Sequence, residues 1–119
     1  MKTASFHILR VGTAITFLWI GILILKDPQL WGGFIQSWVS DLLPISTGNI
    51  ALGAAFFDIF VGVLLLVDYF AWLAALLGAI HIFLVLFVSG INAITIRDIG
   101  LLAAAVALFI DSYKQKTNG

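Results

Sequence analysis

The chain has 119 residues, of which 62% are hydrophobic and 10% charged, and its mean hydropathy is +1.15. A water-soluble domain of this size covers its surface with charged side chains, so the composition excludes one and predicts an integral membrane protein. The formal net charge is zero, which gives no reason to expect a nucleic-acid partner. Because cysteine is absent, the chain forms no disulfide or thiolate metal site and cannot itself carry electrons through thiols.

Four apolar blocks predict four membrane-spanning helices, over residues 6–25, 50–67, 71–89 and 94–110. Each block approaches the roughly 20 residues that a helix needs to cross about 30 Å of hydrocarbon. The predicted fold class is therefore all-α, an integral membrane four-helix bundle. The chain is too short for a second domain, so residues 1–119 are expected to form one.

The first apolar block follows Lys2 and has some features of a secretory signal peptide. It is longer than the apolar part of a typical signal, Arg10 interrupts its start, and no small-residue cleavage site precedes Pro28. We therefore expect it to stay in the protein as the first helix. Pro28 ends this helix because the proline ring does not fit a helix interior.

Residues 29–43 predict a helix of a different kind. Hydrophobic side chains recur near the helical period, and polar side chains occupy the opposite face. The segment is short and contains Trp31 and Trp38, and tryptophan is enriched where the membrane meets water. We expect one amphipathic helix in the headgroup layer, ended by Pro44.

The connection between the second and third predicted spans is only Asp68-Tyr69-Phe70, so these two helices should be antiparallel neighbours. Four crossings would place both chain termini on one side of the membrane. That side has a small excess of basic residues, with Lys2, Lys114, Lys116 and the nearby Arg10 against Lys26 and Arg97 on the other. The positive-inside rule then favours cytoplasmic termini in a multi-pass protein of the cell membrane.

Pairs of small residues four positions apart occur in three of the predicted spans. They are Ala51 and Ala55, Ala74 and Gly78, Gly100 and Ala104, and Ala103 and Ala107. Small side chains let helix backbones approach closely in lipid, so these pairs predict faces where helices meet.

Asp58 and His81 are ionisable residues near the middle of the second and third predicted spans. Exposing a charge to lipid there costs about 2.5–3.5 kcal/mol on insertion scales. Asp58 should therefore face the bundle interior, a wet cavity or a partner protein, and His81 should reach a similar depth. We hypothesise that the two side chains face one interior polar pocket. Alternatively, the pair only sets the register of two helices and has no chemical role.

Three further charged residues lie near the ends of predicted spans. Arg10, about one turn inside the first span, either extends to the headgroups or pairs with Asp68 or Asp111. Arg97 and Asp98 lie at the outer rim, where a structural salt bridge or headgroup contact would account for them. A fixed cation at that rim could also hold an anionic substrate.

The sequence argues against several cofactors. His7 and His81 are the only histidines and are predicted at different depths, so a heme with two histidine ligands is not expected. One histidine and one aspartate are an incomplete ligand set for a transition metal. The sequence also contains no phosphate loop, catalytic triad signature or dinucleotide fingerprint.

Short motifs occur in order along the chain. The first helix has Arg10-Val11-Gly12, Trp19-Ile20-Gly21 and Lys26-Asp27-Pro28, the second has Asp58-Ile59-Phe60-Val61-Gly62-Val63-Leu64-Leu65, and the fourth has Ile96-Arg97-Asp98-Ile99-Gly100-Leu101-Leu102. In this order the chain resembles, over nearly its whole length, the DoxX family of small four-helix membrane proteins from bacteria and archaea. Many members have glutamate where this chain has Asp58, and the spacing of the first motif is shorter here. The resemblance marks Arg10, Asp58, Arg97 and Asp98 as family-pattern positions without assigning a catalytic role.

Some members of that family are the membrane part of a thiosulfate:quinone oxidoreductase, and others are linked to sulfur or oxidative-stress metabolism. The resemblance therefore implies an accessory or anchor subunit of a membrane redox or respiratory system, with quinone access to a pocket around Asp58. One alternative is a quinone-reducing oxidoreductase subunit, with Asp58 and His81 handling protons and Arg97 holding an oxyanion. Another is a small ion or solute carrier around Asp58. The partners considered are the lipid bilayer, another membrane protein and a second copy of the chain.

Overall fold

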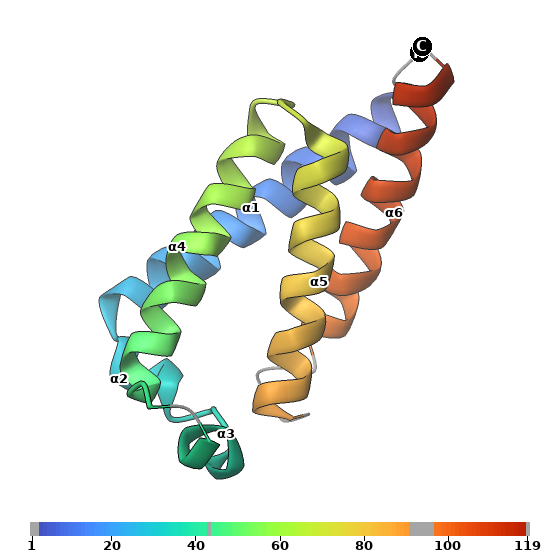
Figure 1. The fold of residues 1–119 in the computed structure, drawn as a ribbon. Helices are drawn as coiled ribbons and strands as arrows, with labels where there is room; N and C mark the ends of the chain where they lie inside the picture. Colours follow the sequence, from blue (N-terminus) through green and yellow to red (C-terminus); the bar gives the residue numbers. More distant parts are fainter. Residues whose placement is uncertain (1–2, 43, 91–96, 119) are drawn as a thin grey trace.

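The computed structural model describes residues 3–42, 44–90 and 97–118. Among these residues the regular secondary structure is entirely helical, with no β-strand. The helices are α1 (Ala4–Lys26), α2 (Pro28–Gly32), α3 (Ser37–Leu42), α4 (Thr47–Leu66), α5 (Ala71–Ser89) and α6 (Arg97–Asn118) (Figure 1). This arrangement confirms the all-helical fold class.

Local chemistry explains where the long helices begin and end. The hydroxyl of Thr3 accepts the backbone N–H of Phe6 at 3.1 Å at the start of α1. The hydroxyl of Ser46 accepts the backbone N–H of Asn49 at 3.3 Å at the start of α4. Such caps satisfy N–H groups that have no partner within the helix. At the other end of α1, Pro28 begins a new helix, as its ring suits a first turn.

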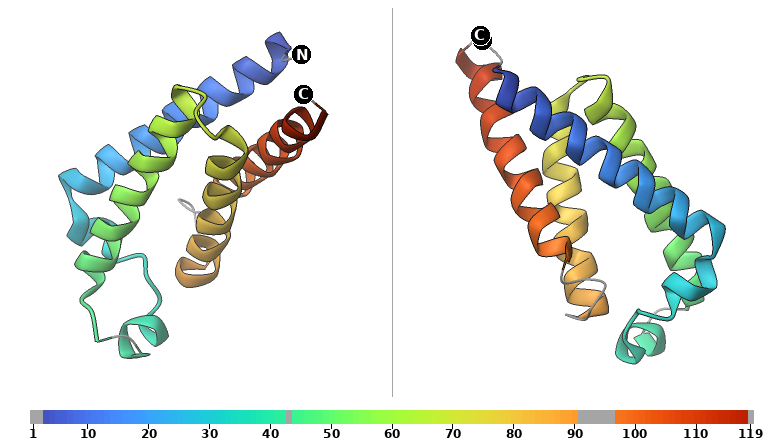
Figure 2. Two further views of the ribbon diagram at one scale, coloured as in Figure 1. Left: turned by 45° about the horizontal axis from the view of Figure 1, so that its top comes forward. Right: turned by 180° about the vertical axis from the view of Figure 1, so that it is seen from behind.

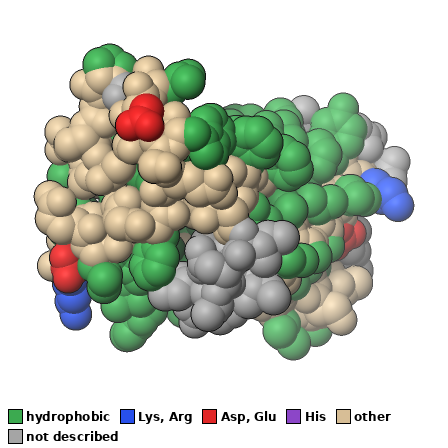
Figure 3. Space-filling model, turned by 90° about the horizontal axis from the view of Figure 1, so that it is seen from below, with side chains coloured by type: hydrophobic (Ala, Val, Ile, Leu, Met, Phe, Trp, Pro, Cys, Tyr) green, Lys and Arg blue, Asp and Glu red, His purple; other side chains and the backbone are tan. Residues whose placement is uncertain are grey.

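Helices α1, α4 and α5 are long and apolar enough to cross a membrane, with 23, 20 and 19 residues. Their outward faces carry large hydrophobic side chains, among them Trp19, Phe60 and Phe83, each more than half exposed. Seen from the end that carries α3, much of the visible surface is hydrophobic and few side chains are charged (Figure 3). The hydrophobic outward faces of α1, α4 and α5 are stable against acyl chains, so the chain is a membrane protein in contact with the lipid bilayer.

The fourth predicted span, residues 94–110, is described only from Arg97 onward. Helix α6 continues past that range to Asn118 and includes Asp98, Asp111 and Lys114. Its uncharged run, residues 99–110, rises about 18 Å at 1.5 Å per residue, which is shorter than the hydrocarbon layer. Over the described residues, α6 is not among the candidate spans, and a fourth crossing stays a prediction.

The single amphipathic helix predicted over residues 29–43 is wrong for the residues described there, since residue 43 lies outside them. Two short helices, α2 and α3, form in its place. Gly32 and Gly33 end α2, because glycine has a poor helix propensity. The backbone N–H of Gln36 then donates to the carbonyl of Val88 in α5 at 3.1 Å. A contact between distant segments therefore replaces the hydrogen bonds of a continuous helix.

The long helices pack as two antiparallel pairs, α1 with α4 and α5 with α6 (Figure 2). Helices α4 and α5 are close at their short connection and diverge toward α2 and α3 (Figure 1). The main core cluster joins all four long helices and includes Phe6, Phe17, Val61, Leu65, Ala75 and Leu108. Both chain termini lie beyond the end where the pairs are joined (Figure 2).

Glycine allows α1 and α4 to approach closely at two levels. A Cβ atom at Gly21 would lie 2.6 Å from Cγ1 of Ile59 and 2.9 Å from the carbonyl oxygen of Ala55. A Cβ atom at Gly62 would lie 2.6 Å from Cγ of Leu18. Neither position has room for a side chain, so these glycines set the distance between the two helices.

The contact faces predicted from small residues are wrong for α6. The buried row of this helix is Leu101, Ala105, Leu108 and Ser112, whereas Ala103 and Ala107 are exposed. A Cβ atom at Gly100 would meet nothing within 4 Å. Burying a leucine side chain stabilises the fold more than burying an alanine side chain. The face of α6 that carries Leu101 and Leu108 therefore packs against the core, and the face that carries Ala103 and Ala107 does not.

Replacing Gly21 with valine should destabilise the packing of α1 on α4. The expected loss is about 1–3 kcal/mol of unfolding free energy, because the added atoms overlap the α4 backbone. Gly12→Val is the matched control, since a Cβ atom at Gly12 meets nothing within 4 Å. Reversible unfolding in mixed detergent micelles measures both, and equal stabilities for the two variants would contradict the close-approach interpretation.

Candidate functional site

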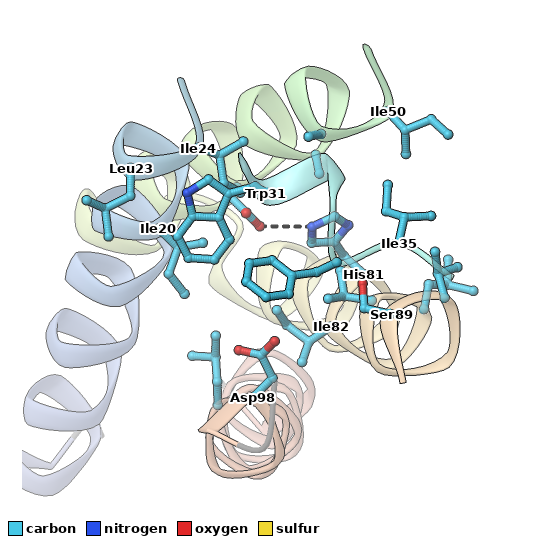
Figure 4. A pocket seen from close by; sticks show the side chains of 18 of the residues that line it. Ile20, Leu23, Ile24, Trp31, Ile35, Ile50, His81, Ile82, Ser89 and Asp98 are labelled. Carbon is cyan, nitrogen blue, oxygen red and sulfur yellow. Dashed lines mark ion pairs between the residues drawn. The ribbon is translucent and has the colours of Figure 1, made fainter. Parts of the chain in front are cut away.

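Asp58 of α4 and His81 of α5 meet in the space between the two helix pairs. Nε2 of His81 lies 3.0 Å from Oδ1 of Asp58, and a dashed line marks this contact in Figure 4. The side chain of Asp58 is 3% exposed and that of His81 is 15% exposed. A carboxyl group buried this deeply needs a polar partner. Among the described residues, His81 is the polar partner that Asp58 has.

The turn between α4 and α5 brings the two residues to the same level. Asp68 and Phe70 adopt positive φ angles of 57° and 49°, which reverse the chain within a few residues. The ring of Phe57, one position before Asp58, packs against the His81 ring with 4.8 Å between centroids and 39° between planes. This contact restricts the orientation of the imidazole ring beside the carboxyl group.

The Asp58–His81 pair borders a cavity of about 570 Å³ between the two helix pairs. Most of its lining is apolar and comes from α1, α2, residues 33–36, α4, α5 and α6, and Figure 4 labels Ile20, Leu23, Ile24, Trp31, Ile35, Ile50 and Ile82 among these side chains. Its polar lining residues, apart from tryptophan, are Thr16, Asp58, His81, Ser89 and Asp98. Small-molecule sites have volumes of roughly 300–1,000 Å³ and mostly apolar walls with a few polar groups. The cavity has the size and chemistry of such a site.

The segment between α2 and α3 contributes Phe34 and Ile35 to this cavity. It is held against the end of α5 by the hydrogen bond from Gln36, and by an edge contact between Trp38 and Phe87 with 5.7 Å between ring centroids. These lining residues were not predicted, because contact between this segment and α5 produces no periodic pattern in the sequence. The aromatic content of the segment was the one signal available.

Arg10 lies at the other end of α4, away from the cavity. Its Nη1 atom donates to the carbonyl oxygens of Leu65 and Leu66 at 2.7 and 2.8 Å. Its Nε atom lies 3.4 Å from Nδ1 of His7 and 4.0 Å from Oδ2 of Asp68. The last carbonyls of a helix have no partner within it, and a cation there also interacts favourably with the helix dipole. Arg10 therefore caps α4 from α1.

The remaining predicted site residues are placed as follows. The ion pair of Arg10 is with Asp68 rather than with Asp111, the other partner considered. Asp98 borders the cavity at the start of α6 and points toward it in Figure 4. Its position in the first helical turn is favourable for a negative charge. The side chain of Arg97 lies outside the described residues, so its proposed hold on an anion stays a prediction.

The arrangement suits an uncharged polar group better than a metal ion. No three His, Cys, Asp or Glu side chains come together as a metal site in the described ranges. Asp58 accepts hydrogen bonds, and an imidazole can donate or accept them and can carry a proton. The pair could therefore hold a carbonyl or hydroxyl group at the wall of an apolar chamber and exchange a proton with it.

Comparison with known proteins identifies a family. A family model described as DoxX matches residues 5–91, which include α1 to α5 and the cavity residues on them. No curated protein and no solved structure matches the chain.

Replacing Arg10 with glutamine should leave the carbonyls of Leu65 and Leu66 without their charged donor. The expected loss is about 1–3 kcal/mol of unfolding free energy, because the hydrogen bonds from a charged donor to the end of α4 are lost. Lys26→Gln, which removes an exposed cation from the last turn of α1, should leave stability unchanged. Reversible unfolding in detergent measures both variants. An Arg10→Gln variant with the same unfolding free energy as the original chain would show that the cap contributes nothing to stability.

Proposed function

The chain belongs to the DoxX family, and we propose that it is an accessory subunit of a membrane redox system that binds a quinone beside Asp58 and His81. One observation carries this proposal. A buried acid–imidazole pair, 3.0 Å apart, forms the polar part of a largely apolar cavity of about 570 Å³. A lipophilic ring fits apolar walls, and its oxygen atoms need polar partners once they leave water.

The chain's own residues support proton handling in this cavity. A quinone takes up two electrons and two protons when it is reduced to the quinol. His81 can donate a proton to a ligand oxygen or accept one from it, and the Asp58 carboxylate would stabilise the protonated imidazole. The 15% exposure of His81 leaves its ring accessible from the cavity, while Asp58 stays behind it.

Electron transfer is assigned to a partner. The chain contains no cysteine, so no thiol pair of its own can relay electrons to a bound quinone. We therefore favour an accessory or anchor subunit that holds the quinone for a redox partner over a subunit that reduces quinone on its own.

We also propose that α6 crosses the membrane and completes a four-helix bundle with cytoplasmic termini. Leu101 and Leu108 of α6 belong to the main core cluster. Helix α6 also packs along α5 in both views of Figure 2. A helix so placed beside a spanning helix shares its depth, and the undescribed residues 91–96 add apolar sequence before it.

Replacing Asp58 with asparagine or His81 with phenylalanine should weaken quinone binding. The protein in lipid nanodiscs is titrated with a benzoquinone that carries a decyl chain, and binding is followed by quenching of tryptophan fluorescence. We expect Kd to rise about tenfold in each variant, which corresponds to about 1.4 kcal/mol. Asp41→Asn, which changes an exposed carboxyl on α3, should bind as the original chain does.

Two results would contradict the quinone proposal. One is a failure of the original chain to bind the decyl benzoquinone. The other is an unchanged Kd in both cavity variants while circular dichroism shows that they remain folded.

Labelling of single cysteines tests the four-crossing topology, because the chain has no native cysteine. Ser5→Cys and Lys114→Cys should react with a membrane-impermeant maleimide only after the cells are opened. Asp41→Cys, on α3, should react in intact cells. Labelling of the Ser5 and Lys114 positions from opposite sides would show that α6 does not cross.

A further inference from the structure

The lining of the cavity reaches the outer surface of the helices. Three of its lining residues are more than half exposed: Trp19 at 63%, Ile15 at 52% and Leu84 at 51%. They lie on α1 and α5, both long and apolar enough to span the membrane. Exposed apolar side chains on spanning helices face acyl chains. The cavity therefore opens toward the bilayer beside Ile15 and Trp19, which are neighbours on α1, and this opening is called the mouth.

Trp19 lies deep in the membrane rather than at its surface. Helices α1 and α4 are antiparallel, and Leu18 packs against Gly62 while Gly21 packs against Ile59. Trp19 is thus level with the middle of α4, close to the depth of the buried carboxyl group. Tryptophan is usually enriched at the membrane surface, where its N–H group reaches water. At the depth of Trp19, the acyl chains offer that group no hydrogen-bond acceptor.

The indole N–H of Trp19 has no acceptor among the described residues. Trp38 is different, since its Nε1 atom donates to Oε1 of Gln36 at 2.7 Å. The hydroxyl of Thr16, also in the cavity lining, is already engaged with the carbonyl of Gly12 at 2.9 Å. Trp19 is therefore a hydrogen-bond donor at the mouth that a ligand could use.

The charges beside the cavity indicate the class of ligand. Asp58 and Asp98 both border it, and carboxylates would repel an anionic ligand. Carboxylates accept hydrogen bonds and do not donate them. A ligand with carbonyl oxygens therefore needs donors, and His81 and Trp19 are donors at the inner wall and at the mouth.

We propose that the ligand is an uncharged lipophile that enters from the bilayer beside Ile15 and Trp19 of α1, and that Trp19 donates its indole N–H to an acceptor oxygen on it. The hydrocarbon tail of the ligand stays in the mouth against Ile15. This inference rests on the proposed quinone function and adds the route of entry and a residue that determines specificity.

The experiment uses the full chain in nanodiscs and two probes, the benzoquinone with a decyl chain and the same ring without a chain. Trp19→Phe keeps an aromatic ring and removes the N–H group, and it should bind both probes about fivefold to tenfold more weakly, as for one lost hydrogen bond. Trp72→Phe is the matched control, since Trp72 packs on Tyr113 away from the cavity lining, and it should bind as the original chain does.

Narrowing the mouth tests the route of entry. Ile15→Phe should slow association of the decyl probe several-fold and leave association of the chainless probe nearly unchanged. Phe83→Leu, at an exposed position outside the lining, should change neither rate. Equal rates for the Ile15 variant and the original chain with the decyl probe would overturn entry from the bilayer beside Trp19.

The depth of Trp19 is tested without altering it. A variant with Trp31, Trp38 and Trp72 all replaced by phenylalanine retains Trp19 as the one fluorophore. Lipids brominated deep in the acyl chain should quench it more than lipids brominated near the headgroup, and the opposite order would overturn the inference. If the original chain binds neither probe, the proposed function and this inference both fail. If only the Asp58 and His81 variants lose binding and Trp19→Phe does not, the inference alone fails.

Discussion

The contact between Asp58 and His81 is the constraint on which the arrangement of the helices depends. A carboxyl group in the middle of a spanning helix cannot face acyl chains without a large cost. In this chain it is 3% exposed and lies 3.0 Å from an imidazole on the next helix. That contact joins the two helix pairs across the space where they diverge, and it makes one wall of an otherwise apolar cavity polar.

The shape around this contact comes from side-chain size at each level of the helices. Gly21 and Gly62 bring α1 close to α4, with no room for added atoms. Nearer the joined end, the ring of Phe17 reaches Gly78 of α5, where an added Cβ atom would lie 2.9 Å from it. This contact between Phe17 and Gly78 holds the two helix pairs together on one side of the Asp58–His81 level. On the other side the pairs diverge, and the cavity lies between them.

Part of the candidate site was predicted from the sequence alone. Counting residues from the short turn at Asp68 placed Asp58 and His81 at a similar depth, and in the structure they meet. Arg10 was expected to extend to the headgroups or to pair with Asp68 or Asp111. Its shortest contacts are with the carbonyls of Leu65 and Leu66, which no residue pattern reveals. Similarly, the amphipathic pattern of residues 29–43 predicted one continuous helix. It contains no sign of the hydrogen bond from Gln36 to α5 that accompanies the break after Gly33.

The sequence by itself determined that the chain is a helical membrane protein of the DoxX family and where three of the four predicted spans lie. Transfer from water to lipid is a sum over individual residues, so hydropathy along the chain predicts spans without knowledge of packing. Small residues had marked the buried faces of α4 and α5, at Ala51, Ala55, Ala74 and Gly78. Only the tertiary structure decided which faces of α1 and α6 meet other helices, because a helix that is apolar on all sides has no preferred face. The buried leucine row of α6, the depth of Trp19 and the cavity beside Asp58 all follow from those rotations, which are set by contacts between residues far apart in the chain.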